Sequence, residues 1–350
     1  MLIDELLRTT LNEGASDLHL TVGIPPTMRK NGRLVTIGDE RLQPEDTEEL
    51  VKTMLNEDQW KTFQEIGELD LSFSLQGMGR FRVNVYKQRG TCCAAIRMVN
   101  LIIPSFAELG LPSIVSDLSK KTKGLILVTG PTGSGKSTTL ASIINVINKS
   151  KDCHILTLED PIEYLHKHDK SIVNQREIGN DSQSYAAALR AALREDPDVI
   201  LVGEMRDIET ISIAVTAAET GHLVLSTLHT IGAANTIDRI IDVFPPHQQQ
   251  QIRVQLSMVI QGVISQQLLP RKDKPGRVAA IEVMVATPAI QNLIREGKTY
   301  QINSQIQTGA KFGMQTMDSS LSSLYKSGNI THEDAVRHSA DGENLLRYMI

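Results

Sequence analysis

The sequence is poor in cysteine, in aromatic residues and in excess positive charge. Its three cysteines, Cys92, Cys93 and Cys153, form no CxxC pair, which excludes a cysteine-rich zinc site and a disulfide framework. Aromatic residues make up 4% of the chain, too few for a platform that stacks nucleic-acid bases. With 36 Lys and Arg against 41 Asp and Glu, the net charge is −5, so we expect no general nucleic-acid binding.

Long apolar runs are also missing. No stretch reaches the length of a membrane span, and the start, MLIDELLRTTLNEG, carries acids where a secretory signal would be uninterruptedly apolar. The 350 residues, 41% of them hydrophobic, are enough for about two domains with cores of their own. The composition therefore predicts a soluble, reduced, cytoplasmic protein.

Residues 1–100 predict a small α+β domain. Apolar residues from Ile3 to Leu11 recur at helical spacing, and the Asn-Gly pair at 31–32 is a hairpin signal between short alternating segments. A helical pattern over 43–66 precedes three further alternating segments, LDLSFSL, GRFRVNVYKQ and TCCAAIRMVN. Strands joined by tight turns predict an antiparallel sheet with a few helices.

The pattern changes after a predicted linker at 101–123, which holds two prolines and a lysine cluster. From Gly124 onward, four apolar runs alternate with helical stretches: GLILVTG, HILTLE, DVILVG and HLVLSTL. Buried strands that alternate with helices predict a mostly parallel sheet with helices on both faces. After residue 246 the pattern predicts mainly helix. We therefore expect a second domain over 124–350.

A glycine-rich segment fits the phosphate-binding pattern G-x-x-x-x-G-K-[ST]. It follows a predicted strand and precedes a predicted helix, so its backbone N–H groups can surround phosphate oxygens at a helix N-terminus. Lys136 is expected to reach the β- and γ-phosphates and Ser137 to bind Mg²⁺, whereas the alternative is a strand–helix turn that binds nothing. The predicted ATP-binding residues are Gly130, Pro131, Thr132, Gly133, Ser134, Gly135, Lys136, Ser137 and Thr138.

Acidic side chains follow two of the predicted parallel strands. Glu204 comes directly after DVILVG, and Glu159, Asp160 and Glu163 lie at the end of HILTLE. Ligands collect at the carboxyl ends of parallel strands, so these acids should face the phosphates. Glu204 could hold Mg²⁺ or orient the attacking water, or it could only stabilise the next helix. We expect the general base to be Glu163 or Glu204.

A histidine stands at each end of the strand HLVLSTLHT. Only His229 lies at the carboxyl end, where it could sense the γ-phosphate or relay a hydrogen bond to an acid. His222 lies at the opposite end. For both residues, the alternative is an imidazole that is satisfied by the local backbone.

Two arginines are predicted to face each other in the hairpin around Arg89-Gly90. The expected register pairs apolar residues on one face: Phe81 with Met98, Val83 with Ile96 and Val85 with Ala94. On the other face Arg82 lies opposite Arg97, and like charges in that position repel. The pair therefore needs an anion, either a nearby carboxylate or a nucleotide phosphate, and the phosphate could belong to a neighbouring subunit.

These segments together resemble the secretion and pilus-motor ATPase family, and within it the ATPases that retract type IV pili. The family's N-terminal domain is similar to ASDLHLTVGIPPTMRKNGRL and its Walker A loop to GPTGSGKS. Its aspartate box is similar to LTLEDPIEY, its atypical Walker B to DPDVILVGEMRD and its histidine box to GHLVLSTLHT. Arg82 and Arg97 fall where the family places N-terminal-domain arginines at the nucleotide. Placement and resemblance together predict catalytic roles for Glu204, Glu163, Glu159, His229, Arg82 and Arg97, and Mg²⁺ binding by Ser137 and Glu204.

The resemblance also implies an architecture. It predicts a PAS-like α+β domain over 1–100 and a RecA-like P-loop ATPase core over 124–350, whose helical C-terminal region begins near 287. Assembly and type II secretion ATPases are longer and usually carry a tetracysteine zinc site, which this sequence lacks. Residues 293–298, LIREGK, are similar to the AIREGK motif of the retraction branch, with Leu293 in place of alanine. For that stretch, the alternative is an ordinary solvated helix end with Gly297 as its cap.

The implied function is ATP-driven retraction of type IV pili, and hence twitching motility. The resemblance implies a homohexamer on the cytoplasmic face of the inner membrane that acts on the platform protein of the pilus machinery. Three alternatives remain open: an accessory retraction ATPase, a nucleic-acid translocase on the same core, and a nucleotide-binding ring component without turnover.

Overall fold

The computed structural model describes residues 2–30, 32–75, 78–99 and 102–349, and it divides the chain into two compact units, residues 1–101 and 102–350. Unit 1 contains α1 (Ile3–Asn12), β1 (Asp17–Leu20), β2 (Thr27–Lys30), β3 (Arg33–Thr36), α2 (Pro44–Met54), α3 (Glu57–Ile66), β4 (Glu68–Leu75), β5 (Gly79–Gln88) and β6 (Thr91–Met98).

The strands that are described in unit 1 form one antiparallel sheet in the order β3-β2-β1-β6-β5-β4. Its apolar face packs against α1, α2 and α3 around Leu7, Val51 and Phe63. The β5–β6 register pairs Phe81 with Met98 and Arg82 with Arg97, as the hairpin pattern predicts. This register leaves the charged face of the sheet away from the core.

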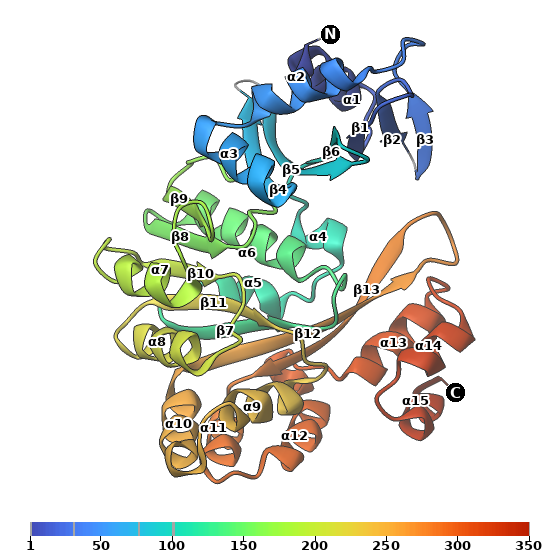
Figure 1. The fold of residues 1–350 in the computed structure, drawn as a ribbon. Coiled ribbons are helices and arrows are strands. Elements are labelled where there is room, and N and C mark those ends of the chain that lie inside the picture. The colour runs from blue at the N-terminus through green and yellow to red at the C-terminus, as the bar shows by residue number, and fades with distance from the viewer. Residues whose placement is uncertain (1, 31, 76–77, 100–101, 350) are drawn as a thin grey trace. The chain divides into compact units, whose positions relative to one another are not determined.

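In unit 2 the remaining strands form one mixed sheet, and helices cover both of its faces (Figure 1). Its elements are α4 (Phe106–Leu109), α5 (Ile114–Ser119), β7 (Gly124–Thr129), α6 (Lys136–Ser150), β8 (His154–Glu159), β9 (Ile172–Glu177), α7 (Tyr185–Ala192), β10 (Val199–Val202), α8 (Ile208–Glu219), β11 (Leu223–Leu228), α9 (Ala233–Asp242), α10 (Pro246–Val259), β12 (Ile260–Pro270), β13 (Arg277–Val285), α11 (Pro288–Arg295), η1 (Thr299–Gln301), α12 (Ile302–Thr308), η2 (Ala310–Phe312), α13 (Met317–Lys326), α14 (His332–His338) and α15 (Gly342–Met349).

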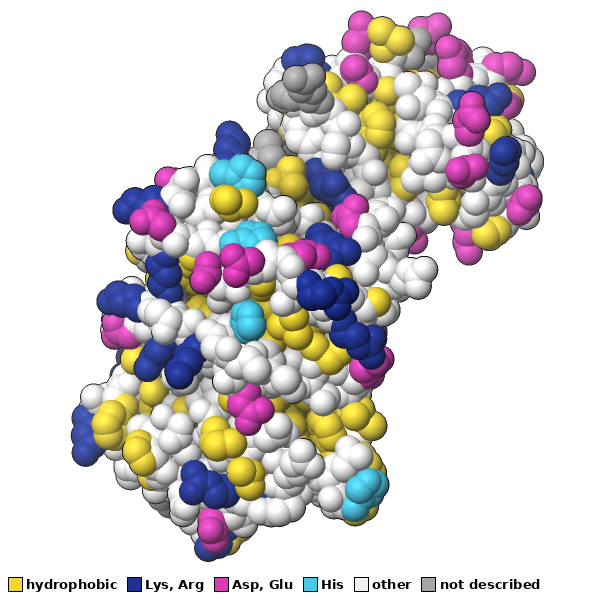
Figure 2. Space-filling model, turned by 90° about the vertical axis from the view of Figure 1, so that its left-hand side faces the viewer, with side chains coloured by type: hydrophobic (Ala, Val, Ile, Leu, Met, Phe, Trp, Pro, Cys, Tyr) yellow, Lys and Arg dark blue, Asp and Glu magenta, His cyan; other side chains and the backbone are white. Residues whose placement is uncertain are grey.

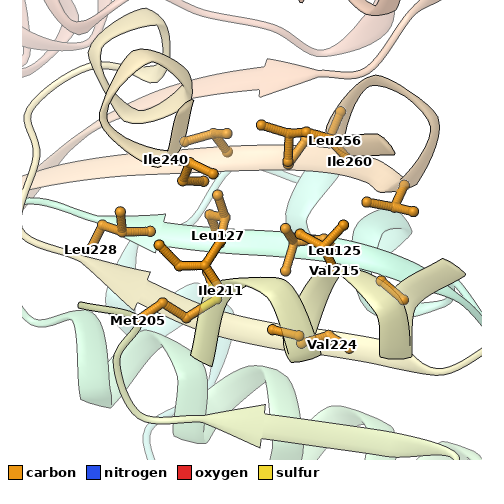
Figure 3. Packing of buried hydrophobic residues seen from close by; sticks show 14 of the residues in the cluster. Leu125, Leu127, Met205, Ile211, Val215, Val224, Leu228, Ile240, Leu256 and Ile260 are labelled. Carbon is orange, nitrogen blue, oxygen red and sulfur yellow. The ribbon is translucent and has the colours of Figure 1, made fainter. Parts of the chain in front are cut away.

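The sheet order is β13-β12-β7-β11-β10-β8-β9, and all pairs are parallel except β12 with β13. The four predicted apolar runs are β7, β8, β10 and β11, which confirms the mostly parallel sheet. Side chains alternate along β7. Figure 3 shows Leu125 and Leu127 on the same side of the sheet as Ile211 and Val215 of α8, while Ile126 packs on the opposite side with α6.

Two expectations from the sequence need correction. The stretch 101–123, predicted as a linker, contains α4 and α5, and Val115 of α5 is fully buried against the sheet of unit 2. Residues 260–285, predicted as mainly helical, form the antiparallel hairpin β12–β13 (orange in Figure 1). The run VISQQLL has no period of two because β12 lies inside the sheet and both of its faces are covered. Helices do dominate from Pro288 onward.

Charge is mixed on the face that Figure 2 shows, where Lys and Arg side chains are interspersed with Asp, Glu and His. No helix among the described residues is both long enough and apolar enough to cross a bilayer.

Candidate nucleotide-binding site

The loop between β7 and α6 has the strand–loop–helix context that the phosphate-binding motif requires. β7 ends at Thr129, and α6 begins at Lys136 after Gly135, whose φ of 89° lies in the left-handed region that favours glycine. The free N–H groups and positive partial charge at the start of a helix attract phosphate. The loop therefore has the form of a phosphate cradle.

The Lys136 side chain lies back along this loop. It is 9% exposed, and its Nζ donates hydrogen bonds to the carbonyl oxygens of Gly130 at 2.9 Å and Pro131 at 3.0 Å. Burial lowers the pKa of the Lys136 ammonium, and the Glu204 carboxylate acts in the opposite direction. The loop carbonyls thus hold the ammonium next to the backbone that would surround phosphate.

The hydroxyl groups near the start of α6 have different environments. Ser137 is exposed, which leaves its hydroxyl accessible to a metal ion. Thr138 shares a 2.9 Å hydrogen bond with the Tyr164 hydroxyl. Ser134 is 2% exposed, its side chain lies beside Gly130, and its backbone N–H donates to the Pro131 carbonyl at 3.2 Å, so this residue closes the turn of the loop.

Gln266 of β12 supports the loop from behind, and the sequence analysis did not find it. Its Nε2 donates to the Ser134 carbonyl at 2.6 Å, and its Oε1 accepts from the Thr139 hydroxyl at 2.9 Å. A Cβ added to Gly130 would lie 2.2 Å from the Gln266 carbonyl oxygen, so the loop can lie this close only because residue 130 is glycine. Since these contacts span more than 120 residues of sequence, no local pattern signals them.

Glu204 borders a cavity of about 480 Å³ beside the phosphate-binding loop. Its side chain is 20% exposed, and its Oε2 lies 2.8 Å from Arg206 Nε and 3.5 Å from His229 Nε2. The carboxyl ends of β10 and β11 bring Glu204 and His229 together, as the parallel topology predicts. The lining residues are Thr132, Glu204, Met205, Arg206, Thr227, Leu228, His229, Thr230, Arg239 and Val243.

The acids after β8 differ in their accessibility. Both oxygens of Glu159 face protein donors: Oε1 accepts from Thr157 at 2.7 Å and Gln175 at 3.1 Å, and Oε2 faces the Glu163 amide at 3.5 Å. Burial raises the pKa of Glu159, although these hydrogen bonds oppose the shift. Glu163 is exposed. Glu159 is therefore held as a brace of the loop, whereas Glu163 is free to turn.

Tyr185 of α7 is a second residue that the sequence analysis missed. Burial raises the pKa of its hydroxyl, and the carboxylates of Glu204, Asp160 and Glu159 add to the effect. A Cβ added to Gly203 would lie 2.8 Å from the Tyr185 hydroxyl oxygen. This contact gives a steric reason for glycine immediately before Glu204.

The two histidines are in unlike surroundings. His229 borders the cavity, and 45% of its side chain is exposed. His222 lies at the other end of β11, where its Nδ1 is 2.9 Å from the Ala217 carbonyl oxygen. His222 thus matches the alternative of an imidazole satisfied by local backbone, and His229 is the one that the structure brings to the acids.

The arginine pair lies on the polar face of the unit 1 sheet, beside a cavity of about 170 Å³. Arg97 Nε donates to Asp17 Oδ1 at 2.8 Å. Burial raises the pKa of the Asp17 carboxyl, but the hydrogen bonds from Ser16 and Arg97 outweigh burial, and the net shift is downward. Arg97 therefore has the carboxylate partner of the simpler alternative, whereas Arg82 is exposed and forms no ion pair within the described residues.

The fold and site together define a P-loop ATPase: a mostly parallel sheet presents a phosphate loop, an acid and a histidine at the same edge. The chain belongs to the family of type II/IV secretion system proteins, whose model matches residues 1–337.

Individual relatives match over nearly the full length. The chain is 49% identical to the protein named "Type IV pilus retractation ATPase PilT" of Pseudomonas aeruginosa, over 98% of this chain and 99% of that one. It is 43% identical to "Type IV pilus ATPase PilU" of the same organism, over 100% of this chain and 91% of that one. The crystal structure of the pilus retraction motor PilT with bound ADP superposes with a TM-score of 0.92 at 52% identity and covers 99% of both chains.

Replacing Gln266 by alanine tests the support behind the loop. The Q266A variant leaves the buried Ser134 carbonyl and Thr139 hydroxyl without their partner, at a cost of about 1–3 kcal/mol for each group. We expect ADP affinity, measured by isothermal titration calorimetry, to fall about tenfold. Gln267 bonds to His338 on the other side of β12, so Q267A is the control and should bind ADP normally. Equal losses in both variants would contradict the assignment.

Proposed function

We propose that this chain is the motor ATPase of type IV pilus retraction and so drives twitching motility. The match to PilT over almost the whole of both chains carries the proposal, because it includes the N-terminal unit as well as the ATPase core. A homohexamer at the cytoplasmic face of the inner membrane would act on the platform protein of the pilus machinery. In this ring, ATP hydrolysis moves each N-terminal unit relative to a neighbouring ATPase unit.

Nucleotide binding in this proposal rests on the loop at 130–138. Its backbone N–H groups and Lys136 bind the β- and γ-phosphates. The Ser137 hydroxyl and the Glu204 carboxylate would hold Mg²⁺, and hard oxygen donors of these types suit that ion. Bound Mg²⁺ would neutralise part of the negative charge of the phosphates.

Hydrolysis requires a group that orients or deprotonates the attacking water. Glu204 is our choice over Glu163, because it borders the cavity and its Oε2 lies 3.5 Å from His229 Nε2. His229 accompanies Glu204 as the γ-phosphate sensor. The Arg206 guanidinium pairs with the Glu204 carboxylate at 2.8 Å, and in this proposal it would release the carboxylate when phosphate binds.

Arg82 is the arginine that we propose to act on a neighbouring subunit's nucleotide. Its side chain is exposed, whereas Arg97 is tied to Asp17 and positions the sheet face. A guanidinium that approaches the γ-phosphate stabilises the charge that develops there. Catalysis would then require two subunits, which links hydrolysis to motion within the ring.

A second candidate is an accessory retraction ATPase, because the chain also matches a second type IV pilus ATPase, PilU, at 43% identity over its whole length. A nucleic-acid translocase is disfavoured, because basic side chains on the face in Figure 2 are mixed with acidic ones.

Deleting the gene tests the function in cells. We expect hyperpiliated cells without twitching, since assembly would continue while retraction stops. Bald cells would contradict the proposal and indicate assembly. Near-normal twitching that fails only under mechanical load would support the accessory role. Complementation with the wild-type gene and with K136A separates the role of ATP from the presence of the protein.

The Glu204→Gln variant tests the catalytic acid. It keeps the size of the side chain but removes the charge, so we expect ATP hydrolysis to fall by on the order of 10²-fold or more while nucleotide binding persists. Phosphate release and nucleotide titration measure the two effects separately. Glu163→Gln is the matched control, and a larger loss in that variant would transfer the role to Glu163.

Mixing two inactive variants tests the action of Arg82 across subunits. R82A subunits retain Lys136, and K136A subunits retain Arg82, so a mixed ring contains some interfaces with both groups. We expect partial recovery of ATP hydrolysis on mixing, measured by phosphate release, and near-normal activity for the exposed control R33A. No recovery in rings shown by native mass spectrometry to be mixed would contradict action in trans.

A further inference from the structure

Glu282 is a buried carboxylate in the middle of β13, and its side chain joins two helices. The residue is 7% exposed. Its Oε1 accepts a 2.8 Å hydrogen bond from the amide of Ala233, the first residue of α9, and its Oε2 accepts one of 3.4 Å from the amide of Met317, the first residue of α13. One carboxylate therefore caps two helix N-termini that are separated by more than 80 residues.

Burial and the nearby Asp318 carboxylate disfavour a negative charge on Glu282, and the two helix starts are the groups that stabilise that charge. Within the described part of the chain, it makes no ion pair with a cation. Burial raises the pKa of Glu282, and the two amide hydrogen bonds oppose this. The positive partial charges of α9 and α13 point at the same group, which stabilises its negative charge. Loss of either amide contact would leave the carboxylate poorly solvated.

The first of these helices begins just after the loop that bears His229. The Gly232 amide in this loop donates to the Ser265 hydroxyl at 2.9 Å, one residue before Ala233 meets Glu282. Thr236 of α9 shares a 2.7 Å hydrogen bond with Thr230. The loop 229–232 is therefore fixed by β11 at its start and by β12 and β13 at its end.

The second helix belongs to the C-terminal group α13–α15. Gln315, which precedes α13, pairs with Val283 of β13, and its Nε2 donates to the Ile281 carbonyl at 2.6 Å. Leu321 of α13 and Leu345 of α15 share one buried cluster with Leu269 of β12. A shift of this helix group would therefore act on the same β-hairpin that carries Glu282.

We infer that Glu282 is a positioning residue that sets the His229 loop and couples its position to the C-terminal helices. This inference rests on the proposed function, because it takes the His229 loop to act at the γ-phosphate. Glu282 acts on this loop and not on the phosphate loop, whose support comes from Gln266. Its loss should therefore slow turnover without weakening nucleotide binding.

Glu282→Gln in the full-length chain tests the inference. Glutamine has one carbonyl oxygen where the carboxylate has two. The amides of Ala233 and Met317 each need one acceptor oxygen, so one of the two helix starts loses its partner. We expect kcat for ATP hydrolysis to fall about tenfold, with KM for ATP and the Kd for ADP within about twofold of the parent values. Adding Glu282→Gln to a His229→Ala chain should cause little further loss, since both changes act on one element.

Asn148→Ala is the control. Asn148 is also buried and joins two backbone segments, because its Nδ2 donates to the Lys167 carbonyl and its Oδ1 accepts from the Asp169 amide, and it lies near the end of α6 that is far from the phosphate loop. We expect kcat within about twofold of the parent value even if the melting temperature falls as far as in E282Q. If E282Q does not fold, Ser265→Ala, which removes the Gly232 acceptor, should reproduce the loss in kcat.

Three results would overturn the inference. Equal loss of kcat in E282Q and N148A would assign Glu282 to general stability. A raised KM with unchanged kcat would show an effect on binding instead. If the parent protein hydrolyses no ATP in any oligomeric state, the proposed function fails, and the inference fails with it; the first two results leave the proposed function intact.

Discussion

The site depends on one constraint: the backbone of the phosphate loop must stay open while strand β12 lies almost in contact with it. Gly130 and Gln266 meet that constraint together, because glycine leaves the space and the glutamine amide satisfies a loop carbonyl and a helix hydroxyl. Lys136 then bonds to the loop carbonyls rather than to a carboxylate. The cradle is thus set by tertiary contacts as much as by its own sequence.

Local patterns allowed much of this protein to be predicted. The phosphate loop and the four buried strands have short-range signals, and parallel topology then places Glu204 and His229 at one sheet edge. The register of the β5–β6 hairpin also follows from its turn, which is why Arg82 and Arg97 are opposed as predicted. The partner of Arg97 could not be foreseen in this way, because Asp17 is 80 residues distant and reaches it only through the β1–β6 pairing.

The parts that the sequence did not reveal depend on long-range packing. β12 and β13 have no alternating pattern because both faces of the strands are covered, so periodicity could not separate them from helix. Gln266, Tyr185 and Glu282 each act through a contact with a distant element. A glutamine in a strand or a tyrosine at a helix start gives no chemical signal by itself.

The β12–β13 hairpin gives the two halves of the site a common support. Gln266 faces the phosphate loop, while the next residue, Gln267, bonds to His338 at the end of α14. Across the hairpin, Glu282 caps both α9 and α13. Gln266, Gln267 and Glu282 are buried, so α13 cannot move away from β13 without breaking the contact between Glu282 and the Met317 amide. The position of the His229 loop and the position of the C-terminal helices are therefore connected through the Glu282 side chain of β13.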